Sequence, residues 1–229
     1  MKIYIVFLVI LTLFIGSCAK DNNPTVTVVY DLDPITSLVL SISGNVRIIE
    51  GTTQRVEVTG SKKTVDRISK SVRSGIWRIE LLSGFEDNYD NLEITITSNE
   101  IENMINFSSG HIFSENILPL KSLRIAGSGS FDVKTKSVDL HNGIDGSGII
   151  NISGTADRFY YAISGSGDYH GFNLVSKEVI IMTTEGGNTE ITATDSLDVR
   201  INGWGNVYYK GDPSIKTAIN GTGTLINSN

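Results

Sequence analysis

Hydrophobic and polar residues alternate along most of the chain, and glycine interrupts the alternation at regular intervals. From about residue 107 onward the sequence repeats with a period near 19 residues, and each repeat carries a short glycine turn. The glycines of the regular turns are Gly127, Gly129, Gly146, Gly148, Gly165, Gly167, Gly203, Gly205, Gly221 and Gly223. On both sides of a turn, apolar residues recur at every second position, which indicates half-buried β-strands. Each repeat is therefore predicted to be two short strands joined at a tight corner.

Two architectures could hold such repeats: an antiparallel sandwich of hairpins, or a parallel β-helix in which each repeat is one coil. In a β-helix, equivalent residues of successive coils lie about 4.8 Å apart, so that similar residues form columns. The column just before the turns is polar and consists of Asp145, Ser164, Thr184, Asn202 and Asn220. Such a column can form hydrogen bonds along the stack. The repeat therefore favours an all-β fold, a right-handed parallel β-helix or β-solenoid with Gly-Ser-Gly corners.

The corner glycines are expected to adopt backbone conformations with positive φ, which a Cβ atom resists. On this interpretation, valine at Gly165 or Gly167 would destabilise the fold. The residue between two corner glycines is expected to point outward, because the corner is tight.

The first part of the body follows the repeat less closely. The segment Ser37–Gly44 resembles a repeat, and Leu92–Thr97 alternates like a strand. The apolar spacing predicts a short helix over residues 64–71, and residues 100–105 are predicted to form a second helical turn. We expect this irregular N-terminal part, residues 34–107, to cap or widen the end of a solenoid formed by residues 108–229.

The chain begins with a charged residue, an apolar run and then small residues. Residues 3–15 would form a helix only about 20 Å long, too short for a hydrocarbon core of about 30 Å. This order is typical of a secretory signal. The run ends in Ile15-Gly16-Ser17-Cys18, which resembles the lipobox of bacterial lipoproteins, and Cys18 is the one cysteine of the chain. The alternative is a plain secretory signal with an incidental cysteine.

The lipobox resemblance implies a signal peptide over residues 1–17 and fatty acylation of Cys18, with palmitate as a typical chain. Residues 18–33 would then be a lipidated tether. The protein would be exported and anchored in the cell envelope, with the outer membrane as the expected location and the lipid on Cys18 as its contact with the membrane.

Composition and charge exclude several classes of partner. The net charge is −6, so nucleic acid is not an expected partner. A single cysteine cannot form an internal disulfide or a cysteine-rich zinc site. The three histidines, His111, His141 and His170, lack metal-ligand spacing. We therefore predict no metal site and no cofactor.

The turn sequences are similar to those of a known family. The segments Ala126–Ser130, Ile163–Asp168 and Ile201–Val207 resemble the Bacteroidetes family called putative auto-transporter adhesin, head GIN domain. The resemblance extends over roughly residues 34–225, and it implies a β-helical, secreted or lipid-anchored surface protein with an adhesin or binding role. The chain departs from the Gly-Ser pattern at Glu185-Gly186-Gly187 and at Trp204.

Trp204 is the leading candidate for ligand binding, because it stands between two corner glycines where other repeats have a small residue. Tyr208, Tyr160 and His170 are expected to point outward by alternation. Flat aromatic rings beside polar groups suit sugar rings, and exposed aromatic residues are enriched at protein interfaces, so a glycan or protein ligand is expected. The alternative is that Trp204 only covers the gap left by Gly186.

Two other function classes stay open. Parallel β-helices include polysaccharide-active enzymes, but no two or three acidic residues converge in the columns, so we expect no enzyme. A self-assembling envelope protein is the third class, because the coil that ends near Ile226 would expose strand edges and favour self-association. Separately, Asp195-Ser196-Leu197 resembles an O-glycosylation acceptor of Bacteroidetes secreted proteins.

Overall fold

A computed structural model describes residues 23–82 and 91–229, and this part of the chain is almost entirely β-structure. Its 17 strands form one continuous hydrogen-bonded network. No helix within the described ranges is long and apolar enough to cross a membrane. The predicted signal peptide and Cys18 lie outside the described residues.

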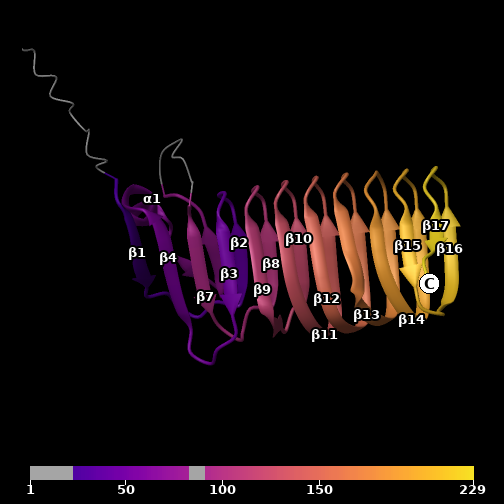
Figure 1. Cartoon of the computed structure of the whole chain (residues 1–229), viewed down its shortest axis with the longest axis horizontal. Coiled ribbons are helices and arrows are strands. Elements are labelled where there is room, and N and C mark those ends of the chain that lie inside the picture. Colours follow the sequence, from indigo (N-terminus) through magenta and orange to yellow (C-terminus); the bar gives the residue numbers. More distant parts are fainter. Residues whose placement is uncertain (1–22, 83–90) are drawn as a thin grey trace, which may run out of the picture.

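The repeats form the predicted solenoid. Its regular strands are β8 (Asn103–Asn106), β9 (His111–Leu118), β10 (Ser122–Ile125), β11 (Ser130–Ile144), β12 (Ile149–Ile163), β13 (Asp168–Thr183), β14 (Thr189–Ile201), β15 (Val207–Lys210), β16 (Ser214–Ile219) and β17 (Leu225–Asn227). All of these strands pair in parallel, and Ser130 lies beside Ile149, which lies beside Asp168. The antiparallel sandwich is thereby excluded. Figure 1 shows the coils stacked along the long axis, with the glycine corners in a row along the upper edge.

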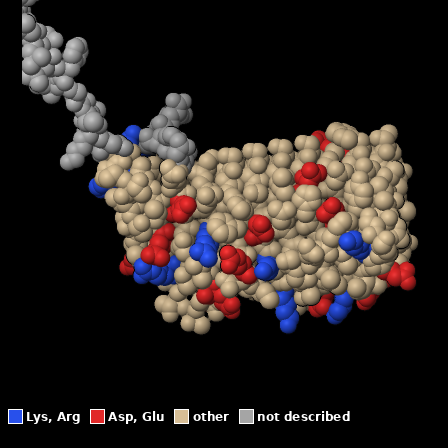
Figure 2. Space-filling view, viewed as in Figure 1, with Lys and Arg blue, Asp and Glu red and all other residues tan. Residues whose placement is uncertain are grey.

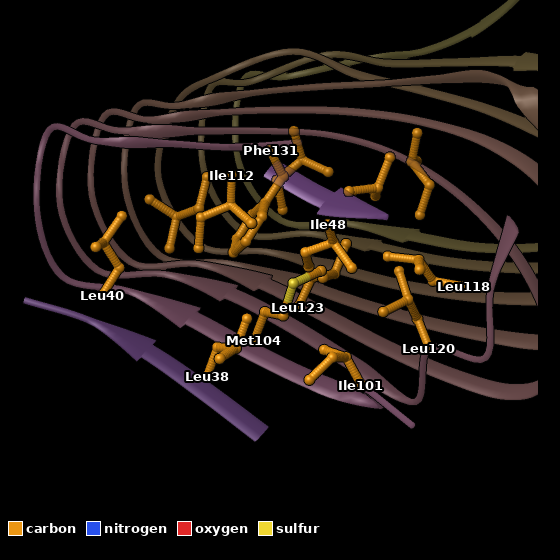
Figure 3. Packing of buried hydrophobic residues seen from close by; sticks show 14 of the residues in the cluster. Leu38, Leu40, Ile48, Ile101, Met104, Ile112, Leu118, Leu120, Leu123 and Phe131 are labelled. Carbon is orange, nitrogen blue, oxygen red and sulfur yellow. The ribbon is translucent and has the colours of Figure 1, made fainter. Parts of the chain in front are cut away.

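Each coil is flattened, so the network folds back at the corners into two facing sheets. The pre-corner sheet consists of the strand segments before each glycine corner, and the post-corner sheet of the segments after it. Inward residues from the two sheets meet in one apolar core, as Leu123 and Phe131 do in Figure 3. Leu123, Ile144, Ile150 and Phe131 are all fully buried. Every residue of this core lies between Tyr30 and Val207, so residues 19–229 contain all of it.

The start of the stack has a spatial order that differs from the chain order. Its elements are β1 (Thr25–Tyr30), β2 (Ser37–Leu40), β3 (Asn45–Ile49), β4 (Arg55–Ser61), α1 (Lys62–Arg67), β5 (Val72–Arg73), β6 (Ile76–Ile79) and β7 (Glu93–Thr97). Strand β2 lies between β6 and β8, and β3 lies between β7 and β9, all in parallel. Along the chain, Ser37 is therefore the first residue that pairs in parallel. Antiparallel strands β1 and β4 close this end together with α1.

The two helix predictions for this region need correction. The helix spans Lys62–Arg67 and not residues 64–71, because the Ser61 hydroxyl caps its start by accepting a hydrogen bond from the Thr64 N–H. At the other end Ile68 is extended and forms a β-bridge with Leu81. No second helical turn forms over residues 100–105. Met104 is buried there in strand β8, which stacks between β2 and β10.

The positive φ expected at the glycines of the regular Gly-x-Gly corners is also wrong, and among the corners that follow the pre-corner sheet only the divergent one at Gly187 has it. Among the glycines of the described ranges, positive φ occurs at Gly75, Gly154, Gly187 and Gly211. Gly165 is required for a different reason, which is the close approach of two coils. A Cβ atom on Gly165 would lie 2.1 Å from the carbonyl oxygen of Gly146. That oxygen already accepts hydrogen bonds from the N–H groups of Ser166 (3.0 Å) and Gly167 (3.2 Å).

The coil formed by β16 and β17 leaves part of the core uncovered. Ile215 and Ile219 are 44% and 45% exposed, whereas the equivalent Leu197 and Ile201 of the preceding coil are 1% and 0% exposed. Within the described ranges, the outer edge of this coil has no partner strand. The backbone of Gly211 is bound by the Asn229 side chain, which accepts at 2.8 Å and donates at 2.9 Å.

Candidate ligand-binding site

Trp204 lies at the corner between β14 and β15, and its side chain points outward as predicted. The backbone N–H of Trp204 donates to the carbonyl oxygen of Glu185 at 3.0 Å, so the corner is fixed by the coil before it. The indole is 62% exposed. It also covers Gly186, because a Cβ atom there would lie 2.5 Å from the indole Nε1 atom. Exposure and packing, which the sequence presented as alternatives, therefore occur together.

Polar side chains flank this corner on both sides. Two residues before Trp204, Asn202 accepts a hydrogen bond from the Asn220 amide at 3.0 Å. Two residues after it, Asn206 accepts from the Thr224 N–H (3.1 Å) and hydroxyl (2.7 Å). The predicted polar column is confirmed by the bond between Asn202 and Asn220. It is confirmed again where Ser164 donates to Asp145 at 2.7 Å. Each amide keeps further hydrogen-bonding capacity, because a side-chain amide has two donor hydrogens and an acceptor oxygen.

His170 and Tyr208 share one outward column of the post-corner sheet. Glu190 lies between them, beside His170 on one strand and beside Tyr208 on the other. The His170 Nδ1 atom is 3.2 Å from a carboxylate oxygen of Glu190. Tyr208 is half-buried and follows Trp204 by four residues. This column therefore runs along the sheet that starts at the Trp204 corner.

Tyr160 does not join that group, because it lies on the pre-corner sheet, across the core. Its ring stacks on His141 with centroids 4.6 Å apart and an angle of 8° between the planes. Coil spacing explains this geometry, since strands lie about 4.8 Å apart and rings in one column can cover one another. The face of Tyr160 toward His141 is therefore closed to a ligand. Of the four candidate residues, His170 and Tyr208 share one column, Trp204 lies at the corner where that sheet begins, and Tyr160 lies on the other sheet.

The sequence reasoning missed two exposed apolar residues beside Tyr160. Ile180 neighbours Tyr160 in the next coil, and Met182 follows it on the same sheet; they are 45% and 41% exposed. The sequence feature that could have indicated these two residues is the segment Val179–Met182, in which apolar residues follow one another without alternation. Such a run places two apolar side chains on the solvent face of a strand.

Several charged residues of the solenoid form ion pairs between neighbouring coils. Lys177 contacts Asp157 at 2.7 Å, and Arg158 contacts Asp139 at 2.5 Å. The hydrogen bond from Lys177 lowers the pKa of Asp157. Across residues 23–82 and 91–229, no group of three His, Cys, Asp or Glu residues could hold a metal ion. Figure 2 shows few charges along the upper edge of this face, where the corners lie.

The buried tyrosines are structural. The rings of Tyr161 and Tyr169 lie 4.5 Å apart inside the core, and the Asn142 amide donates to the Tyr169 hydroxyl at 3.1 Å. Burial raises the pKa of both phenols well above the usual value, which keeps them neutral. Of the proposed glycosylation acceptor, Asp195 is exposed and Ser196 half-buried at the second corner of its coil.

Known proteins match this chain over most of its length. Residues 35–213 match the family model described as "Putative auto-transporter adhesin, head GIN domain". No protein with a curated description matches. Several solved structures share the fold. One is a putative adhesin from Bacteroides fragilis, with a TM-score of 0.83 and 24% identity over 90% of this chain and 97% of that chain.

Two further structures come from Parabacteroides. A putative adhesin from Parabacteroides merdae has a TM-score of 0.74 and 20% identity, covering 91% of this chain and 98% of its own. A putative lipid binding protein from Parabacteroides distasonis has a TM-score of 0.72 and 20% identity, over 91% of this chain and 98% of its own. At these identities the likeness concerns the fold.

Proposed function

The chain belongs to the putative auto-transporter adhesin, head GIN domain family, and we propose that it is an exported, lipid-anchored envelope protein that binds a ligand at the corner around Trp204. The single observation that carries the binding site is the exposed indole, 62% accessible, at a corner flanked by the side chains of Asn202 and Asn206. The family name and the adhesin names of related structures support a binding role.

The proposed ligand is a glycan. A sugar ring can stack its apolar face on a flat aromatic ring while amides bind its hydroxyl groups. The corner offers this combination, because Trp204 lies between the Asn202–Asn220 pair and the Asn206–Thr224 pair. The name of one structural relative, a putative lipid binding protein, makes a lipid the competing ligand.

The anchor is proposed at Cys18, behind a signal peptide over residues 1–17. Support comes from the sequence Ile15-Gly16-Ser17-Cys18. A protein held in the outer membrane by acyl chains on Cys18 would keep the whole solenoid outside the bilayer.

Replacing Trp204 by alanine is expected to weaken glycan binding by about 30-fold, the loss typical of an aromatic hot spot. Stability should fall by only about 1 kcal/mol, because the indole is mostly exposed and loses mainly its contact with Gly186. The measurement is a screen of residues 19–229 against glycans, lipids and host matrix proteins, followed by titration of the best binder and by denaturant unfolding.

Thr222→Ala is the matched control, because Thr222 occupies the same place in the next corner. Trp204→Tyr should retain most of the binding, since a flat ring remains. Unchanged affinity in Trp204→Ala, with stability lost, would mean that the indole serves only to cover Gly186.

Cleavage of a polysaccharide is the less favoured function. Glycosidases need two carboxyl groups that face one scissile bond. In the solenoid, Asp139 and Asp157 instead contact Arg158 and Lys177 of neighbouring coils. This pairing supports a binding surface rather than a pair of acids free for catalysis.

We also propose weak self-association at the coil formed by β16 and β17. The supporting observation is the exposure of Ile215 and Ile219 beside an open strand edge. Lys216, with its side chain 78% exposed on that edge, keeps the association weak.

In sedimentation equilibrium the weight-average mass should rise with concentration, and Ile219→Lys should abolish the rise. Ile149→Lys, an exposed isoleucine inside the stack, is the control. A concentration-independent monomer mass for the unmodified protein would refute the contact.

A further inference from the structure

One segment at the end of the solenoid where the chain enters is rich in positively charged side chains. Residues 62–73 contain five cationic side chains and a single acidic one, Asp66, whereas the whole chain has a net charge of −6. We call these five residues the basic cap. They are Lys62, Lys63, Arg67, Lys70 and Arg73. The remainder of the chain is correspondingly acidic, and this includes neighbouring elements of the same end, which carry Glu57 and Glu80.

The basic cap belongs to the elements that close the stack. Helix α1 covers this end, and β1 and β5 are its outermost strands. Lys62 contacts Asp66 at 2.6 Å, and the Lys70 ammonium lies 4.5 Å from the centre of the Tyr30 ring. Arg73 is exposed on β5. Figure 2 shows Lys and Arg side chains at this end, at the left of the view, with Asp and Glu side chains beside them.

The same end is where the predicted tether joins the fold. The Lys62 N–H donates to the carbonyl oxygen of Pro24 at 2.8 Å, and the Lys63 N–H donates to the Asn23 side chain at 3.0 Å. Cys18 precedes Asn23 by five residues, which span at most about 18 Å when fully extended. A lipid on Cys18 therefore keeps α1 within about that distance of the headgroups.

We propose that the basic cap docks on anionic lipid headgroups and holds the solenoid upright on its membrane. The proposal rests on the lipid anchor of the proposed function. Charge complementarity selects the partner, because each Lys or Arg near an anionic surface contributes about a fivefold gain in affinity. Val29, 51% exposed on β1, adds an apolar contact at the same end. An extended polyanion such as nucleic acid would instead run onto the acidic body of the chain.

The test uses residues 19–229, which contain the whole core and lack both the signal peptide and the lipidated cysteine. In the Bacteroides fragilis relative, 97% of the chain corresponds to 90% of this one, so the same unit folds as a solved structure. Cosedimentation is measured with vesicles of phosphatidylglycerol and phosphatidylethanolamine, and with vesicles of phosphatidylcholine alone. Binding is expected only to the anionic vesicles, and added salt should weaken it.

The variant Lys62→Gln/Lys70→Gln/Arg73→Gln is expected to bind the anionic vesicles about 100-fold more weakly. The matched control is Lys134→Gln/Lys136→Gln/Lys210→Gln, which makes the same change in net charge on the solenoid. Lys210 matches Lys70 in a second respect, because its ammonium lies 4.4 Å from the centre of an aromatic ring, that of Phe172.

Equal losses in the two triple variants, or equal binding to both kinds of vesicle, would overturn the docking proposal. Because the tested chain carries no lipid, these results are independent of acylation at Cys18. Failure of the anchor would appear separately, as release of the full-length protein from membranes.

Discussion

Alanine at Gly165 is expected to destabilise the protein by about 3 kcal/mol, although it adds only one methyl group. The added Cβ would lie 2.1 Å from the carbonyl oxygen of Gly146, a backbone atom that cannot rotate away. The two coils must separate at the corner, and this weakens the hydrogen bonds from Ser166 and Gly167 to the same oxygen. In thermal unfolding the melting temperature should fall by roughly 6–12 °C.

Gly143→Ala is the matched control, since Gly143 lies within strand β11 of the coil before. A Cβ atom there would have its nearest neighbours at 3.6 Å and 3.9 Å, which is ordinary contact. The neighbouring coil already has Ala162 in the paired position. The control should keep the melting temperature of the unmodified protein. Equal melting temperatures for Gly165→Ala and Gly143→Ala would show that the corners are not closely packed.

Serine at Cys18 is expected to leave the protein unprocessed or to release it into the soluble fractions. Sulfur is the atom that receives the lipid in the proposed lipobox, and a hydroxyl group is a much weaker nucleophile. Several acyl chains anchor a protein stably, whereas a chain without them has only weak contacts with the bilayer. The measurements are membrane fractionation of cells and mass spectrometry of the mature amino terminus.

Ser17→Ala tests the same segment without touching the thiol. A small residue remains at that position, so acylation and fractionation should be unchanged. Membrane association of the Cys18→Ser variant equal to that of the unmodified protein would refute the anchor.

The sequence predicted the regular part of the fold well, because each coil stacks on the next with almost the same register. Turn spacing, together with the polar column before the turns, therefore identified parallel coils. The tightness of the corner placed Trp204 outside, and the structure confirms that position. The physical reason is that a coil contacts only its neighbours, so local pattern and tertiary structure coincide.

The start of the stack could not be predicted in the same way. Strands β2 and β3 insert between coils that follow them in the chain, and periodicity contains no information about such an exchange. The glycine error has a similar origin. From the sequence alone, the need for glycine at position 165 could come from a positive φ or from close contact with a neighbouring coil. Only the position of the Gly146 oxygen distinguishes these two explanations. Tyr160 and Tyr208 are likewise separated because Tyr160 precedes its corner and Tyr208 follows its own, and the strands before and after the corners form different sheets.

With the proposed anchor at Cys18, the insertion of β2 and β3 would have a mechanical consequence. When a ligand held far along the stack is pulled, tension passes through Cys18 to β1 and then toward β2. Strand β1 has one neighbour, β4, and can peel away one hydrogen bond at a time. Strands β2 and β3 are each clamped between two parallel neighbours, so their extraction must shear two ladders at once. Under load, the first strand would yield early and lengthen the tether, while the clamp would keep the remaining coils intact.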